Sequence, residues 1–142
     1  MRNRKLKILI AEDELIIALA LKTMLEDEGH EVTSLVSTAL EAITRSQIDK
    51  PDLILMDVLL SGSLNGFEAA RIISYKGKTP IIFLTGNTDE EFLFSLKNVS
   101  NYGFLQKPFD KKQVIDMIEK NIISIQYQTD SLDSVPPSSY TY

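Results

Sequence analysis

Five short apolar runs alternate along the chain with longer segments whose apolar residues recur at helical spacing. Three of these runs are apolar almost throughout, as expected of strands that helices cover on both faces. The alternation predicts an α/β fold: a flavodoxin-like, doubly wound parallel sheet of five strands in the order 2-1-3-4-5, with five helices. The expected strands are Lys7 to Ala11, Glu31 to Val36, Asp52 to Asp57, Pro80 to Thr85 and Tyr102 to Leu105.

Helix boundaries follow from residues that commonly begin and end helices. The first helix is expected after Asp13 and should end at Gly29. The last is expected over about Lys111 to Ile125, where apolar residues stack at helical spacing. Three pairs resemble capping boxes, namely Thr38 with Glu41, Thr88 with Glu91 and Asp110 with Gln113.

The length and composition favour a single compact domain. With 142 residues, 44% of them hydrophobic, the chain can close one core without disulfide or metal staples. We expect a domain over residues 1–125 and a polar, mobile tail over residues 126–142, "QYQTDSLDSVPPSSYTY", which has no Lys or Arg. The tyrosines of this tail leave open that it serves as a docking peptide.

Charge and cysteine content limit the classes of partner and compartment. The net charge of −5 argues against direct nucleic-acid binding, which depends on clustered Lys and Arg. The chain has no cysteine, which suits a reducing cytoplasm, and no apolar stretch approaches the length of a membrane span. We therefore expect a soluble, cytoplasmic protein with no membrane partner.

Polar residues follow the predicted strands at the points where the strands end. Glu12 and Asp13 follow the first strand, Asp57 ends the third, Thr85 ends the fourth and Lys107 follows the fifth. Because the carboxyl ends of parallel strands share one edge, and ligands bind where the winding reverses, these groups should meet there. A helix cap is the commoner reason for Asp13 taken alone, and the two roles are compatible.

Three carboxylates in one place repel one another unless a cation lies between them. Oxygen ligands without His or Cys favour a hard divalent ion, and an incomplete protein ligand set favours Mg²⁺ over Ca²⁺. A cation, a lysine ammonium and a threonine hydroxyl around one carboxylate can stabilise a transferring phosphoryl group. Asp57 is then the nucleophile.

These residues resemble those of a two-component response-regulator receiver domain, over about Lys5 to Ile125. The resemblance is carried by Glu12 with Asp13, Asp57, Thr85 before Gly86, Phe104, and Lys107 before Pro108. Each is a weak signal alone, but together, in this order, they are specific. No folded segment is expected after Ile125, which suggests the stand-alone type of receiver.

The resemblance implies roles for the residues. Asp13, Asp57 and the backbone carbonyl of Leu59 would bind Mg²⁺, with Glu12 reaching the ion through water. A sensor histidine kinase, a phosphotransfer protein or a small phosphodonor would phosphorylate Asp57.

It also implies how the phosphorylated state is signalled. Thr85 and Lys107 would hold the phosphate, and Phe104 would move inward. The face made by the fourth helix, fifth strand and fifth helix would then signal to an unknown protein effector. The family also has a cis bond before Pro108, and receivers often form homodimers through that face.

Two departures from the family pattern lie in the loop after Asp57. Ser61 stands where the family commonly has proline, and Gly66 comes one residue later than usual. Neither change removes a ligand, and Gly62 and Asn65 supply turn-forming residues instead.

Three other functions compete with the receiver. A Mg²⁺-dependent phosphoaspartyl hydrolase would place a second Asp two residues after the nucleophile, where this chain has Leu59. A nucleotide-binding domain would need a Gly-rich loop after the first strand, which the sequence lacks. The chain could also be the receiver piece of a larger hybrid kinase. As a receiver, it would catalyse only its own aspartyl phosphorylation and dephosphorylation, and would not be an enzyme in the usual sense.

Overall fold

The computed structural model describes residues 4–86 and 102–121. Strands and helices alternate as β1 (Lys7–Ala11), α1 (Leu15–Asp27), β2 (Glu31–Val36), α2 (Ala39–Asp49), β3 (Leu53–Asp57), α3 (Gly66–Lys76), β4 (Ile81–Thr85) and β5 (Tyr102–Gln106). Residues 111–121 form a further helix. In these residues, no helix combines the length and apolar character needed to cross a bilayer.

The five strands form one parallel sheet in the order β2-β1-β3-β4-β5, which confirms the predicted topology. β1 and β3 are neighbours, and the winding reverses between them. Their carboxyl ends therefore lie side by side, with Ala11 opposite Met56 in the register. This is the position at which open α/β sheets bind ligands.

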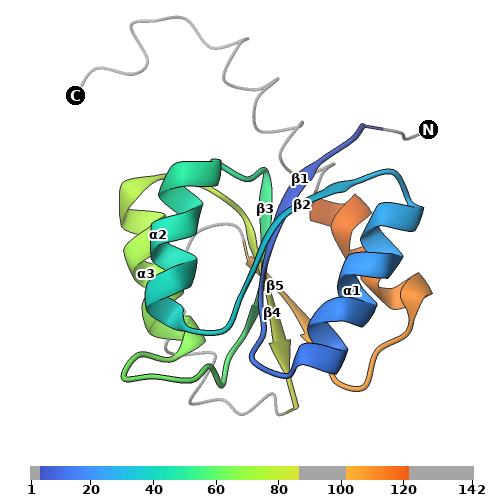
Figure 1. The fold of residues 1–142 in the computed structure, drawn as a ribbon. Helices are drawn as coiled ribbons and strands as arrows, with labels where there is room; N and C mark the ends of the chain where they lie inside the picture. Colours follow the sequence, from blue (N-terminus) through green and yellow to red (C-terminus); the bar gives the residue numbers. More distant parts are fainter. Residues whose placement is uncertain (1–3, 87–101, 122–142) are drawn as a thin grey trace, which may run out of the picture.

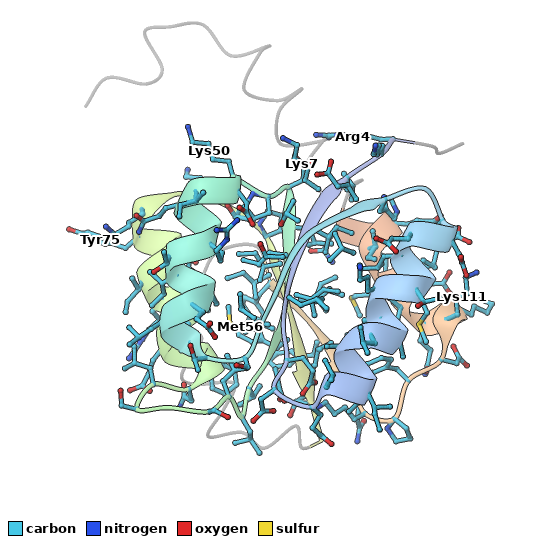
Figure 2. All side chains as sticks on the ribbon, in the orientation of Figure 1. Arg4, Lys7, Lys50, Met56, Tyr75 and Lys111 are labelled. Carbon is cyan, nitrogen blue, oxygen red and sulfur yellow. The ribbon has the colours of Figure 1, made fainter. Side chains whose placement is uncertain are left out.

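Helices cover both faces of the sheet, as Figure 1 shows: α2 and α3 lie on one side, and α1 lies with helical residues 111–121 on the other. Successive side chains of β3 point to opposite faces of the sheet and so contribute to both core layers. Ile54 and Met56 pack towards α2 and α3, while Leu53 and Leu55 pack towards α1. Figure 2 shows Met56 between the sheet and α2. Apolar packing on both faces explains why the central strands are hydrophobic throughout.

The predicted strand bounds are correct to within one residue. Asp52 directly precedes β3, and its carboxylate accepts a hydrogen bond from the Lys7 N–H at 2.8 Å. Pro80 precedes β4, and β5 extends one residue further than predicted, to Gln106.

The helix starts differ from the predictions at two places. Glu14, not Asp13, is the N-cap residue of α1, and it makes no side-chain capping bond. Thr38 does cap α2, but Glu41 reaches back to the N–H of Ser37. At Asp110 and Gln113 both capping bonds are present, as predicted.

One further capping box is found in the described residues, and three expectations lie outside them. An unpredicted capping box joins Asn65 and Glu68 at the start of α3. The predicted box at Thr88 and Glu91 lies outside the described residues, as do the end of the last helix and the tail at 126–142.

Candidate functional site

Backbone hydrogen bonds between neighbouring strands set the positions of the predicted site residues. The N–H of Glu12 donates to the carbonyl of Val36 at 2.9 Å, so the chain leaves β1 still attached to β2. The N–H of Lys107 donates to the carbonyl of Thr85 at 2.8 Å, which holds Lys107 beside the end of β4. The sheet thus extends by one residue at its carboxyl edge and carries the polar side chains there.

The structure brings Glu12, Asp13 and Asp57 together. One carboxylate oxygen from each lies within 4.8 Å of the other two. Glu12 and Asp57 are buried, whereas Asp13 is exposed. The cluster therefore has a closed inner part and one side open to solvent.

Lys107 lies between the two buried carboxylates. Its Nζ donates a hydrogen bond to Oδ2 of Asp57 at 3.1 Å and lies 3.0 Å from Oε1 of Glu12. The second contact is an ion pair without hydrogen-bond geometry. A third carboxylate, that of Glu14, lies 3.8 Å from the same ammonium.

Burial raises the pKa of Glu12 to about 7. The hydrogen bond from the Glu14 N–H to Oε2 of Glu12 and the Lys107 ammonium oppose this rise, while the charge of Asp57 adds to it. Burial alone would lower the pKa of Lys107, but the contacts with Glu12 and Asp57 raise it. Lys107 thus stays charged, and Glu12 is close to titration at neutral pH.

The backbone around Asp57 is fixed by the loop that follows it. The N–H of Leu59 donates to Oδ1 of Asp57 at 3.1 Å, while the Leu59 side chain is 73% exposed. The N–H of Gly66 donates to the carbonyl of Val58 at 2.8 Å and closes the loop. A Cβ at Gly66 would lie only 2.2 Å from the carbonyl oxygen of Asp57, so only glycine fits there.

Thr85 and Phe104 lie on the other side of Asp57. Thr85 is buried at the end of β4, one residue beyond the rung that pairs Leu84 with Asp57. Phe104 is half-buried on β5, and its ring centroid is 5.7 Å from those of both Phe83 and Tyr102. The Lys107–Pro108 bond is cis, as the resemblance implied.

Two residues near the cluster had no predicted role. Ser61 donates a hydrogen bond from Oγ to Oδ2 of Asp13 at 2.9 Å. Glu14 adds a third carboxylate in ion-pair contact with Lys107. The only sign of Ser61 in the sequence was its place in the loop where the resembling family commonly has proline.

The donor set fits a hard divalent cation. In the described part of the chain, Lys107 is the one cation in ion-pair contact with these acidic groups, so they outnumber their counter-charge. Figure 2 shows Arg4, Lys7 and Lys50 at the opposite edge of the sheet, where the strands begin, too remote to compensate them. All available ligands are oxygens, as Mg²⁺ prefers.

Sequence comparison identifies the family. Residues 8–119 match the response regulator receiver domain. The chain belongs to this family. Receiver domains are modules of two-component signalling systems and bind Mg²⁺ at an acidic pocket, and the cluster of Glu12, Asp13 and Asp57 could hold such an ion.

Individual relatives agree with this assignment. The chain is 34% identical over 113 residues to the transcriptional regulatory protein PdtaR of Mycobacterium tuberculosis, a match that covers 80% of this chain and 55% of PdtaR. It is 32% identical over 135 residues to the transcriptional regulatory protein YvrH of Bacillus subtilis, covering 95% of this chain and 56% of YvrH. The chain thus spans about half the length of these curated relatives.

Solved structures give the same fold. The signal receiver domain of a modulated diguanylate cyclase from Desulfovibrio desulfuricans superposes with a TM-score of 0.81 at 30% identity, covering 88% of this chain and 99% of that one. Chemotaxis protein CheY4 of Vibrio cholerae has a TM-score of 0.75 at 28% identity, covering 82% of this chain and 98% of CheY4.

Proposed function

We propose that this receiver is a phosphorylation-activated signalling switch of a two-component phosphorelay, with Asp57 as its phosphoacceptor. The observation that carries the proposal is the environment of Asp57, a buried carboxylate at a strand end with Lys107 on one oxygen and two further carboxylates beside it. Bringing three carboxylates together, two of them buried, is unfavourable unless they serve a ligand.

The covalent step is attack by a carboxylate oxygen of Asp57 on phosphorus. The new P–O bond forms as the P–N bond of a phosphohistidine breaks, and the imidazole leaves with the bonding electron pair. The Leu59 N–H and the Lys107 ammonium orient the Asp57 carboxylate for this attack. Lys107 is also placed to neutralise charge on the phosphoryl oxygens.

Glu12, Asp13, Asp57 and the backbone carbonyl of Leu59 would hold Mg²⁺. When bound, the ion would neutralise charge on the phosphoryl group. Burial and the charge of Asp57 raise the pKa of Glu12, and a bound cation would favour the ionised carboxylate and so lower that pKa.

Thr85 and Phe104 would transmit the phosphorylated state. Thr85 ends β4, which pairs with β3 beside Asp57, and Phe104 lies on β5, the next strand. A movement of Thr85 would therefore reach the edge of the sheet through one neighbouring strand. The output face would include β5 and helical residues 111–121. The segment between β4 and β5, which would supply its remainder, lies outside the described residues.

The partners would be a sensor histidine kinase or phosphotransfer protein and a downstream protein effector in the cytoplasm, with a homodimer through the output face as an option. The domain itself would turn over only its own phosphate. Leu59, with its exposed side chain, occupies the position where a phosphoaspartyl hydrolase needs its acid-base carboxylate, which supports a switch over a hydrolase.

The test is intact-mass analysis after incubation with Mg²⁺ and either acetyl phosphate or phosphoramidate. Wild type should gain one phosphoryl group, and borohydride should reduce the acyl phosphate to homoserine at position 57. Asp57→Asn should gain nothing, whereas Asp27→Asn, an exposed aspartate at the end of α1, should behave as wild type. Labelling elsewhere in the chain, or multiple turnover of a phosphomonoester, would contradict the proposal.

A further inference from the structure

Ser61 joins three loops at the carboxyl edge of the sheet. It lies in the loop between β3 and α3, and its hydroxyl donates to Oδ2 of Asp13, in the loop between β1 and α1. Its backbone forms an isolated parallel bridge with Thr38, in the loop between β2 and α2. Ser61 and Asp13 are 48 positions apart in the chain.

The backbone under Ser61 is held in place by the start of α2. Thr38 accepts a hydrogen bond from the N–H of Glu41 and donates one to its Oε1, both at 3.1 Å. Gly62 follows in a left-handed conformation, with φ of 101°, and sits against Thr38. The serine hydroxyl is therefore presented to Asp13 from an anchored backbone rather than from a free loop.

Asp13 needs such a contact more than its neighbours do. Glu12 and Asp57 are buried and fixed by Lys107 and by backbone N–H groups. Asp13 is exposed, and in the described residues the Ser61 hydroxyl is the one hydrogen-bond partner of its side chain. Without that bond its carboxylate would be free to change rotamer.

We propose that Ser61 is a positioning residue for the cation site. Its hydroxyl holds the Asp13 carboxylate beside Glu12 and Asp57, and so raises the affinity of the cluster for Mg²⁺. Outer contacts of this kind commonly change metal affinity by about 10- to 100-fold. Because Asp13 and Ser61 are both exposed, the lower end of that range is expected. The inference rests on the proposed function, since it concerns the same site.

The experiment measures Mg²⁺ binding to the unphosphorylated full chain by isothermal titration calorimetry. Ser61→Ala should weaken binding about tenfold, and Ser61→Thr, which keeps a hydroxyl, should restore most of the affinity. Ser63→Ala is the matched control, because Ser63 is exposed in the same loop and its side chain makes no hydrogen bond within the described residues. It should bind Mg²⁺ as wild type does.

A second measurement separates positioning from damage to the fold. In Ser61→Ala, the Mg²⁺ concentration for half-maximal phosphorylation by phosphoramidate should rise by the same factor, while the rate at saturating Mg²⁺ should match that of wild type. Wild-type affinity in Ser61→Ala, an equal loss in Ser63→Ala, or a lower rate at saturation would overturn the inference. Those results would leave the labelling of Asp57 intact, whereas a wild type that is not labelled would defeat the proposed function itself.

Discussion

Nζ of Lys107 lies 3.1 Å from Oδ2 of Asp57, although 50 positions of the chain separate the two residues. The same ammonium contacts Glu12, so one cation holds two buried carboxylates together. Lys107 therefore stabilises the cluster when no metal is bound, and it would have to leave at least one of these partners to bind a phosphoryl group.

Replacing this lysine should separate phosphorylation from signalling. We expect Lys107→Ala to be labelled at Asp57 but to lose the difference in partner binding between the phosphorylated and unphosphorylated forms. Without Mg²⁺ the variant should also be less stable by about 2 kcal/mol, because two buried carboxylates lose their counter-charge. Intact mass, pull-down with and without beryllofluoride, and urea denaturation measure these effects.

Lys78→Ala provides the control for a general loss of a lysine. Lys78 is exposed between α3 and β4, outside the site and the output face, and makes no ion pair within the described residues, so labelling, partner binding and stability should stay as in wild type. Equal partner binding by phosphorylated wild type and phosphorylated Lys107→Ala would refute the role of Lys107.

The titration of Glu12 should make stability depend on pH. Because its pKa is raised from 4.5 to about 7 in the folded protein, the folded state binds more protons than the unfolded state between these values. The free energy of unfolding without metal should therefore decrease by about 3 kcal/mol as the pH rises through this window. Urea denaturation at a series of pH values measures it.

Mg²⁺ and Glu12→Gln supply the comparisons for this pH effect. Saturating Mg²⁺ should reduce or reverse the slope, since the ion favours the ionised carboxylate. Glu12→Gln should remove the Glu12 contribution and flatten the metal-free curve. A metal-free slope that is unchanged in Glu12→Gln would assign the titration to another group.

Gly66 should not tolerate a side chain. A Cβ there would meet the carbonyl oxygen of Asp57 at 2.2 Å and Cα of Val58 at 3.0 Å, and both are backbone atoms of the site. We expect Gly66→Ala to lower the free energy of unfolding by about 3 kcal/mol and to slow phosphorylation. Gly77→Ala, with nothing within 4 Å of the added Cβ, should leave phosphorylation unchanged.

Phe104 should matter for the response to phosphorylation rather than for the chemistry. Phe104→Leu removes a ring that contacts Phe83 and Tyr102 but keeps an apolar side chain. We expect normal labelling of Asp57 and at least a twofold smaller change in amide hydrogen exchange along β5 when beryllofluoride binds. Phe109→Leu, a half-buried residue on the other face, is the control and should respond as wild type.

The sheet and the positions of the acidic residues were predictable from local patterns. Residues such as Asp57 follow apolar runs directly, and parallel strands must deliver their ends to one edge. The capping bonds at Asp110 followed from short-range spacing in the same way. The N-cap of α1 was not predictable, because Glu12, Asp13 and Glu14 are all acidic and only the path of the backbone selects among them.

Contacts between loops were harder to predict. The bond from Ser61 to Asp13 and the contact of Lys107 with Glu12 depend on side-chain directions that no periodicity encodes. Likewise His30, just before β2, is half-buried, and its Nδ1 accepts a hydrogen bond from the N–H of Leu6 at 3.1 Å, a contact between residues 24 positions apart. Such pairings follow from loop geometry once the sheet has formed.

The two apolar layers that pack on either face of the sheet limit which residues can be substituted without loss of stability. Two exposed loop residues at the carboxyl edge, Leu59 and Ser61, belong to neither layer, so they can be exchanged without repacking the interior. Substitutions at this edge can therefore change metal affinity or partner preference while the interior maintains the melting temperature. Gly66 is an exception in the same loop, because any side chain there would meet the backbone of Asp57.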